Sequence, residues 1–302
     1  MNPTPLVTIA IPAYKGRYLR QSIDSALAQT HCNIEVVVVD DCSPDIIPDI
    51  VDEYSDPRLR YIRNEQNLGA KDPSQNWNRC LEAAQGEWFC LLCDDDQYAP
   101  DFVEALLRLS TNYPSCNVLR ACVRVIDKEG KQVSLYPQSP NFETLEQYLW
   151  DFFNSRRRQT ISEFMFHRAH MQQLGGYVNM PFAWGSDNLS LFRFACQGGI
   201  ASVPEPLVTF RDSGENISSD QQHMDLKLHA FHQYIQETKR LIAEQHFRSD
   251  LLPVVEAYYR RATVAHMREA SWADLRSIIQ KKTQLDLKAR DIVRGALLRW
   301  LH

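Results

Sequence analysis

The stretch that decides the fold is residues 34–44, IEVVVVDDCSP. Its apolar part is almost entirely β-branched, which is typical of a strand buried on both faces of a parallel sheet. Asp40 and Asp41 follow directly, and then Ser43 and Pro44, which can cap and begin a helix. The sequence therefore predicts a buried strand with carboxylates at its carboxyl end and a helix next.

The same order recurs around this strand. Expected strands cover residues 6–11, 59–62 and 88–92, and expected helices cover 19–27, 74–84 and a segment from Pro100. This alternation predicts a doubly wound, mostly parallel α/β sheet. Shorter strands and helices follow after about residue 117, with a helix over 187–196. Residues 221–302 read as helices with breaks near Pro253 and Ser271.

Three consecutive aspartates, at positions 94–96, follow the fourth expected strand in GEWFCLLCDDDQYAPD, residues 86–101. Adjacent carboxylates repel, so they need either full solvation or a cation. Strand carboxyl ends line the ligand crevice of such a sheet, and oxygen ligands suit Mg²⁺ or Mn²⁺ better than zinc. Taken alone, the run is equally consistent with a solvated acidic turn.

The composition is that of an ordinary globular protein. Of the 302 residues 44% are hydrophobic, and the net charge of -5 gives no sign of nucleic-acid binding. The first residues lack the basic segment of a signal peptide, and no apolar run approaches the ~18 residues that span a bilayer. Cys90 and Cys93 lie in an apolar run, so we expect buried thiols and a cytoplasmic location.

An ordered set of short motifs connects these features. It comprises VTIAIPAY (7–14), VVDDCS (38–43), NLG (67–69), GE (86–87) before the aspartates, YAPD (98–101), GGY (175–177), GSD (185–187) and FR (210–211). The set closely resembles the family 2 glycosyltransferases, inverting enzymes of the GT-A fold that use nucleotide-diphosphate sugars. The resemblance covers about residues 6 to 215.

The resemblance implies roles for individual residues. It places Pro12 and Tyr14 in the nucleotide pocket, Asp41 at the base, Asp94 at the ribose, Asp95 at the metal, Asp96 near water or the acceptor, and Asp187 as general base. A helix N-terminus should lower the pKa of a carboxylate such as Asp187, which could also be a purely structural cap.

The resemblance also divides the chain. It implies a nucleotide-sugar-binding half over 1–125, an acceptor-binding half over 126–215 and a C-terminal helical extension over 216–302. The expected activity is metal-dependent transfer from a nucleotide-diphosphate sugar, with a UDP-sugar favoured, to a hydroxyl of a saccharide or lipid-linked saccharide in bacterial surface polysaccharide or glycolipid synthesis. Mn²⁺ or Mg²⁺ is the expected cofactor.

Several positions depart from the family pattern or stay open. Cys93 stands where many relatives carry an aspartate, Lys15 replaces an asparagine, and no histidine lies between Arg211 and His223 as a metal contact. His167 and His170 are expected to be structural or solvent-facing, and Trp184 either stacks on an acceptor sugar or packs in the protein.

Two other functions and one surface contact stay open. A nucleotidyltransferase or a non-catalytic nucleotide-sugar-binding module could use the same fold. The final expected helix could lie on anionic lipid or pack on the catalytic domain. Its basic residues are Lys281, Lys282, Lys288, Arg290, Arg294 and Arg299.

Overall fold

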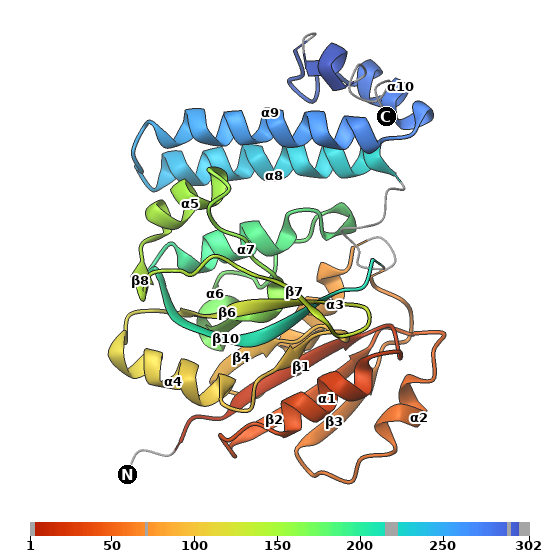
Figure 1. The fold of residues 1–302 in the computed structure, drawn as a ribbon, viewed down its shortest axis with the longest axis vertical. Helices are drawn as coiled ribbons and strands as arrows, with labels where there is room; N and C mark the ends of the chain where they lie inside the picture. The colour runs from red at the N-terminus through yellow and green to blue at the C-terminus, as the bar shows by residue number, and fades with distance from the viewer. Residues whose placement is uncertain (1–3, 70–71, 215–222, 289–290, 296–302) are drawn as a thin grey trace.

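A central mixed sheet with helices on both faces organises the computed structural model, which describes residues 4–69, 72–214, 223–288 and 291–295 (Figure 1). The strand order is β3-β2-β1-β4-β9-β6-β10-β5. The strands are β1 (Val7–Ala13), β2 (Ile34–Asp40), β3 (Leu59–Arg63), β4 (Trp88–Leu91), β5 (Gln97–Tyr98), β6 (Val118–Asp127), β7 (Gln132–Leu135), β8 (Phe142–Glu143), β9 (Phe164–His167) and β10 (Ile200–Asp212).

The first four long strands form the expected parallel unit. β1 pairs parallel with both β2 and β4, and β3 extends β2 in parallel. β9 then runs antiparallel between β4 and β6, and β10 runs parallel to β6. The carboxyl ends of β1, β2 and β4 therefore lie together at one edge, as the sequence predicted, so residues that follow these strands can share a site.

Alternate residues of the buried strands supply two cores, one on each face of the sheet. In β2, Val36 and Val38 pack on one face, and Val37 and Val39 on the other. This period of two explains the β-branched run, because both faces of the strand are covered. The first face packs against α1 and α4, and the second against α3 and the later helices (Figure 1).

The C-terminal helices share the second core. α8 and α9 form a pair over α5 and α7 (Figure 1), and Phe231 of α8 belongs to the same hydrophobic cluster as Phe192 of α7. The helices are α1 (Leu19–Leu27), α2 (Ile47–Val51), α3 (Ser74–Ala83), α4 (Phe102–Asn112), α5 (Leu145–Phe153), α6 (Arg168–Gln173), α7 (Ser186–Ala195), α8 (Met224–Glu244), α9 (Leu251–Glu269) and α10 (Trp272–Gln280).

Two local expectations were wrong. Ser43 does not cap α2, which begins at Ile47 without a side-chain cap. Its hydroxyl instead donates to the carbonyl of Tyr14 at 2.5 Å, because the chain after β2 folds back against the exit of β1. The basic segment that begins at Lys281 is also not a single helix, because turns follow α10. Lys281 itself forms an ion pair with Asp225 of α8 at 3.2 Å.

The sequence also predicted helix breaks near Pro253 and Ser271 in the C-terminal part. The break near Ser271 is confirmed, because its hydroxyl caps α10 by accepting from the N–H of Asp274. Pro253 lies in the first turn of α9, where its missing N–H costs little. Arg290 and Arg299 fall outside the described residues. Among the described helices, none combines the length and apolarity needed to cross a membrane.

Candidate active site

The side chains of the three consecutive aspartates after β4 lie in three different environments. Asp94 is half-buried, and its Oδ2 accepts the backbone N–H groups of Tyr14 at 2.8 Å and Lys15 at 2.7 Å. These bonds join the end of β4 to the exit of β1. Asp94 therefore lies in the crevice between the two strands, where the sequence placed the donor.

Asp96 is turned into the protein and is fully buried. Its Oδ1 accepts the backbone N–H of Arg211 at 3.0 Å, and its Oδ2 accepts the hydroxyl of Ser162 at 2.6 Å. Burial, together with the charge of Asp95, raises the pKa of Asp96 well above its usual value. With no exposed surface, this carboxyl ties β10 and the segment before β9 to β4, in place of the expected proximity to water or acceptor.

Asp95 is the member of the run that is left without donors. Within the described part of the chain, no other residue donates a hydrogen bond to its half-buried carboxylate. Burial first, and then the charge of Asp94, raise the pKa of Asp95 to about 6. A carboxylate that lacks donors and lies beside a second carboxylate is stabilised by a cation.

The surroundings of Asp95 decide what kind of metal site fits. Among the residues that the structure describes, no group of three or more His, Cys, Asp or Glu is arranged to hold an ion. The protein donor set among these residues is thus at most two carboxylates, and hard cations such as Mg²⁺ are bound in proteins by one or two carboxylates together with substrate phosphates and water. The residues fit a cation that arrives with a phosphorylated ligand.

Asp41, after β2, is buried and shapes the turn that follows β3. Its Oδ1 accepts from the Asn64 amide at 2.8 Å and from the N–H of Leu68 at 2.9 Å, and its Oδ2 accepts from the N–H of Gly69 at 2.7 Å. A Cβ at Gly69 would lie 2.7 Å from that same oxygen. The turn thus needs a glycine, and the contact of Asp41 with a base stays a prediction.

The residues expected to line the nucleotide pocket lie at the same sheet edge. Pro12 is in β1 opposite Val39, and Tyr14 follows the strand with 42% of its surface exposed. The structure therefore brings Pro12, Tyr14 and Asp94 together. Their roles in donor binding stay predictions.

Asp187 lies in the first turn of α7, as the sequence predicted. The helix starts after Gly185, which has φ 88°, and a Cβ there would lie 2.8 Å from the ring of Tyr234. The carboxylate accepts from the Asn188 amide at 3.1 Å and, over a longer 3.5 Å, from the Gln159 amide. Asp187 belongs to α7, which packs on the second face of the sheet, whereas Asp94, Asp95 and Asp96 follow β4.

The expected pKa direction for Asp187 was wrong. Burial raises the pKa of this carboxyl, although the N–H of Asn188 and the amide of Gln159 oppose the rise. The helix N-terminus does not dominate, because the loss of water around the half-buried carboxylate is the larger effect. A carboxylate with a raised pKa is a stronger base, which suits proton acceptance.

The other candidates of the sequence are structural. His170 bonds the carbonyl of Phe194 at 3.0 Å, and His167 packs edge-on against Trp88. Trp184 packs against His266, with ring centres 5.4 Å apart. The packing alternative for Trp184 therefore has direct support, and the two histidines serve the fold as expected.

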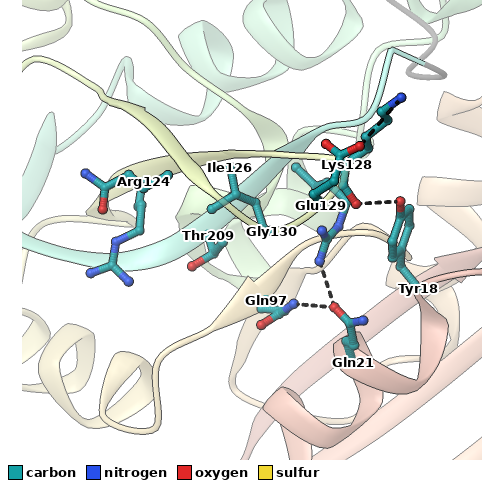
Figure 2. Close-up of a pocket in the computed structure, with 11 residues that line it drawn as sticks. Tyr18, Gln21, Gln97, Arg124, Ile126, Lys128, Glu129, Gly130 and Thr209 are labelled. Carbon is teal, nitrogen blue, oxygen red and sulfur yellow. Dashed lines mark hydrogen bonds and ion pairs between the residues drawn. The ribbon is translucent and has the colours of Figure 1, made fainter.

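Two grooves flank these residues. One, of about 440 Å³, lies between α1 and the β6, β10 and β5 strands, and Figure 2 shows Tyr18, Gln21, Gln97 and Arg124 along it. Arg211 also lines it and reaches the β4 aspartates by donating to the carbonyl of Asp95 at 3.3 Å. The other groove, of about 600 Å³, runs from the loop before α7 to α8. Its lining includes Asn179, Met180, Phe182 and Leu226.

The backbone before α7 carries a feature that the sequence did not indicate. Phe182 and Ala183 have φ values of 60° and 51°, in the left-handed region that non-glycine residues rarely adopt. Such strain persists only where the surroundings over-determine it, and it gathers at functional sites. No residue pattern in this stretch predicts these left-handed backbone conformations.

The fold class is a doubly wound, mostly parallel sheet with strand-end carboxylates. Residues 8–174 match the family described as Glycosyl transferase family 2. Because this match covers more than half of the chain, the protein belongs to that family, and the resemblance inferred from the motifs is confirmed.

Comparisons with individual proteins agree with this assignment. The chain is 39% identical over 145 residues to the succinoglycan biosynthesis protein ExoO of Rhizobium meliloti, an alignment that covers 46% of this chain and 40% of ExoO. The chain spans between 18% and 58% of the length of this and other curated relatives that it matches.

Solved structures share the fold. Residues 1–349 of Staphylococcus aureus TarS in complex with UDP-GlcNAc superpose with a TM-score of 0.66 at 16% identity, over 98% of this chain and 91% of that fragment. The mannosyltransferase PcManGT of Pyrobaculum calidifontis, in complex with GDP-Man and Mn²⁺, gives 0.59 at 16% identity, over 99% of this chain and 88% of that protein. These similarities confirm the GT-A fold.

Proposed function

We propose that this protein transfers a sugar from a nucleotide-diphosphate sugar to an acceptor hydroxyl with inversion at the anomeric carbon. The observation that carries the proposal is the condition of Asp95. In a family 2 chain, at the carboxyl end of β4, it is the one aspartate of the three whose carboxylate receives no hydrogen bond from another residue of the described structure. A diphosphate with a divalent cation would supply what that carboxylate lacks.

On the donor side, Pro12, Tyr14 and Asp41 would contact the nucleoside and Asp94 the ribose, at the edge where β1, β2 and β4 end. Asp95 would hold Mn²⁺ or Mg²⁺, which would stabilise negative charge on the departing diphosphate. The neighbouring structure with GDP-Man and Mn²⁺ supports this combination. The TarS complex with UDP-GlcNAc supports a UDP-sugar as the donor.

On the acceptor side, Asp187 would take the proton from the attacking hydroxyl. The oxygen then forms a bond to the anomeric carbon while the bond from that carbon to the diphosphate breaks, so one displacement inverts the configuration. The raised pKa of Asp187 favours this proton transfer. Residues 1–125 would bind the donor, 126–215 the acceptor, and 216–302 would cover the acceptor half.

The names of the relatives support an acceptor class. ExoO is named for succinoglycan biosynthesis, which supports a growing saccharide of a bacterial surface polysaccharide, free or lipid-linked, as acceptor. The groove of about 600 Å³ beside the loop that leads to Asp187 offers room for it. Its apolar lining residues, among them Met180 and Phe182, suit the apolar faces of sugar rings.

A panel of nucleotide-sugars tests the proposal. Each sugar donor is incubated with the protein and Mn²⁺, and the nucleotide product is separated by chromatography. We expect nucleoside diphosphate from one donor, more of it with a saccharide acceptor, and none when Mn²⁺ is chelated. Release of pyrophosphate from a nucleoside triphosphate and sugar phosphate would identify a nucleotidyltransferase instead, and metal-dependent binding without any product would identify a binding module.

A further inference from the structure

We infer that Gln159 is a positioning residue for Asp187, and that the hydroxyl of Tyr148 and the buried Arg120–Glu163 pair hold Gln159 in place for that purpose. The inference rests on the proposed function only in giving Asp187 its task. The structural claim concerns the orientation and basicity of one carboxylate. No sequence motif marks these residues.

The geometry fixes which end of the Gln159 amide faces Asp187. The hydroxyl of Tyr148, on α5, donates to Oε1 of Gln159 at 2.6 Å, and the Nε2 of the same amide points to Oδ2 of Asp187 at 3.5 Å. An ionised carboxylate only accepts hydrogen bonds, so it needs the NH₂ end of the amide. With Tyr148 donating to the opposite end, both ends of the amide are satisfied in one orientation.

The residues on either side of Gln159 are anchored to one buried ion pair. Arg120 Nη2 donates to the carbonyl of Arg158 at 2.6 Å, and the N–H of Thr160 donates to Glu163 Oε2 at 3.3 Å. Arg120 Nε and Glu163 Oε1 lie 2.7 Å apart, with side-chain exposures of 4% and 0%. The backbone on both sides of Gln159 is thereby fixed, and the side chain has little freedom to turn away from Asp187.

This arrangement gives Gln159 an effect on chemistry that packing alone would not have. Burial raises the pKa of Asp187, and the Gln159 amide opposes the rise by stabilising the charged form. The amide also fixes the plane of the carboxylate, and with it the direction from which a hydroxyl proton can be accepted. The titratable groups that interact with Asp187 are Glu163, Tyr148, Tyr177, Tyr234 and Tyr258.

A double-mutant cycle tests the arrangement. Gln159→Ala should lower kcat roughly tenfold and move the acid limb of the kcat profile to higher pH, with the donor KM unchanged. Tyr148→Phe should have a smaller effect in the same direction, of roughly threefold. Because Tyr148 acts through the amide, the double variant should be no slower than Gln159→Ala alone.

Tyr234→Phe is the matched control. Like Tyr148, Tyr234 is a buried tyrosine that interacts with Asp187, but its hydroxyl has no hydrogen-bond partner in the described part of the chain. Its removal should leave kcat and the pH profile as they are. An equal effect of Tyr234→Phe and Tyr148→Phe would overturn the role of Tyr148.

A measurement without turnover separates this inference from the proposed function. The pKa of Asp187 can be followed by carbon NMR of labelled aspartate carboxyls, with the signal assigned through Asp187→Asn. Gln159→Ala should raise that pKa whether or not the protein transfers sugar. An unchanged pKa in a folded Gln159→Ala variant overturns the inference, whereas a raised pKa in a protein with no transferase product supports it and refutes only the proposed function.

Discussion

The carboxylates after β4 and the carboxylate in α7 are held in opposite ways. At the end of β4, backbone N–H groups from nearby loops and from β10 hold Asp94 and Asp96 and leave Asp95 bare. In α7, side-chain amides reach Asp187, and one of them, from Gln159, depends on residues of α5 and β6. The first site is formed mostly by residues at strand ends. The second is formed by side-chain hydrogen bonds between residues that are distant in the sequence.

The difference separates two functions of a carboxylate. Asp95 receives no hydrogen bond from another described residue and lies beside a like charge, so it should bind a cation. Asp187 is half-buried, and the loss of water around its carboxylate raises its pKa, so it should bind a proton more readily than an ordinary aspartate. Each of the following experiments asks whether this division is real.

The largest effect is expected for Asp187→Asn. Asparagine suits the first turn of α7 but cannot take a proton, so turnover should fall by roughly 10²–10⁴-fold, measured as nucleoside diphosphate release. Donor and Mn²⁺ affinity should stay close to those of the parent protein, since Asp94 and Asp95 are intact. Near-normal turnover in this variant would show that Asp187 is not the proton acceptor, and the proposed difference in function between the two sites would be wrong.

Asp95→Ala should lower the metal-dependent affinity for nucleoside diphosphate by roughly tenfold to a hundredfold, measured by calorimetry. The fold should remain intact, because no neighbouring residue in the described structure bonds to this carboxylate. Asp187→Asn serves as the control that keeps the affinity. Unchanged Mn²⁺-dependent affinity in Asp95→Ala would assign the cation elsewhere.

The pH dependence of turnover reports the state of Asp187. Protonated Asp187 cannot accept a proton, so kcat should fall about tenfold per pH unit below its pKa. Since burial raises that pKa, the fall should begin at a higher pH than the ~4 of an ordinary aspartate. A profile that stays flat down to pH 4 would show that Asp187 is not the titrating base.

The smallest expected effect concerns stability. Asp96→Ala should lower the free energy of unfolding by about 1–3 kcal/mol, because the N–H of Arg211 and the hydroxyl of Ser162 lose a buried acceptor. Asp95→Ala removes the same type of side chain one position away and should cost little without metal. Urea unfolding of the two variants compares them directly, and equal losses would contradict the opposed surroundings described for the pair.

Much of the strand-end site could be predicted from the sequence because local patterns determine it. The β-branched run of β2 and the aspartates after β4 define strands and their ends, so Asp41, Asp94 and Asp95 were expected at one edge. What could not be foreseen is the burial of Asp96, since its partner Arg211 lies 115 residues away.

The α7 site was harder to predict. The position of Asp187 in a first helical turn followed from its pattern, but the direction of its pKa did not, because that depends on water excluded by helices distant in the chain. The same holds for Gln159, which reaches Asp187 only through a segment held by Arg120. Ser43 failed as a cap because α2 begins only at Ile47; its hydroxyl accepts from the N–H of Asp45 in the turn after β2 and donates to the carbonyl of Tyr14.

The contacts of Arg211 with the aspartates after β4 affect when this part of the protein can fold during synthesis. Its backbone bonds Asp96, and its guanidinium bonds the carbonyl of Asp95 and lies 4.1 Å from the centre of the Tyr18 ring. A chain emerging from the ribosome carries these aspartates long before residue 211 exists, and closing so long a loop is slow. The crevice at the ends of β1 and β4 is therefore completed late in synthesis, and an exchange of residues 1–125 between relatives would transfer that crevice without the arginine that contacts it.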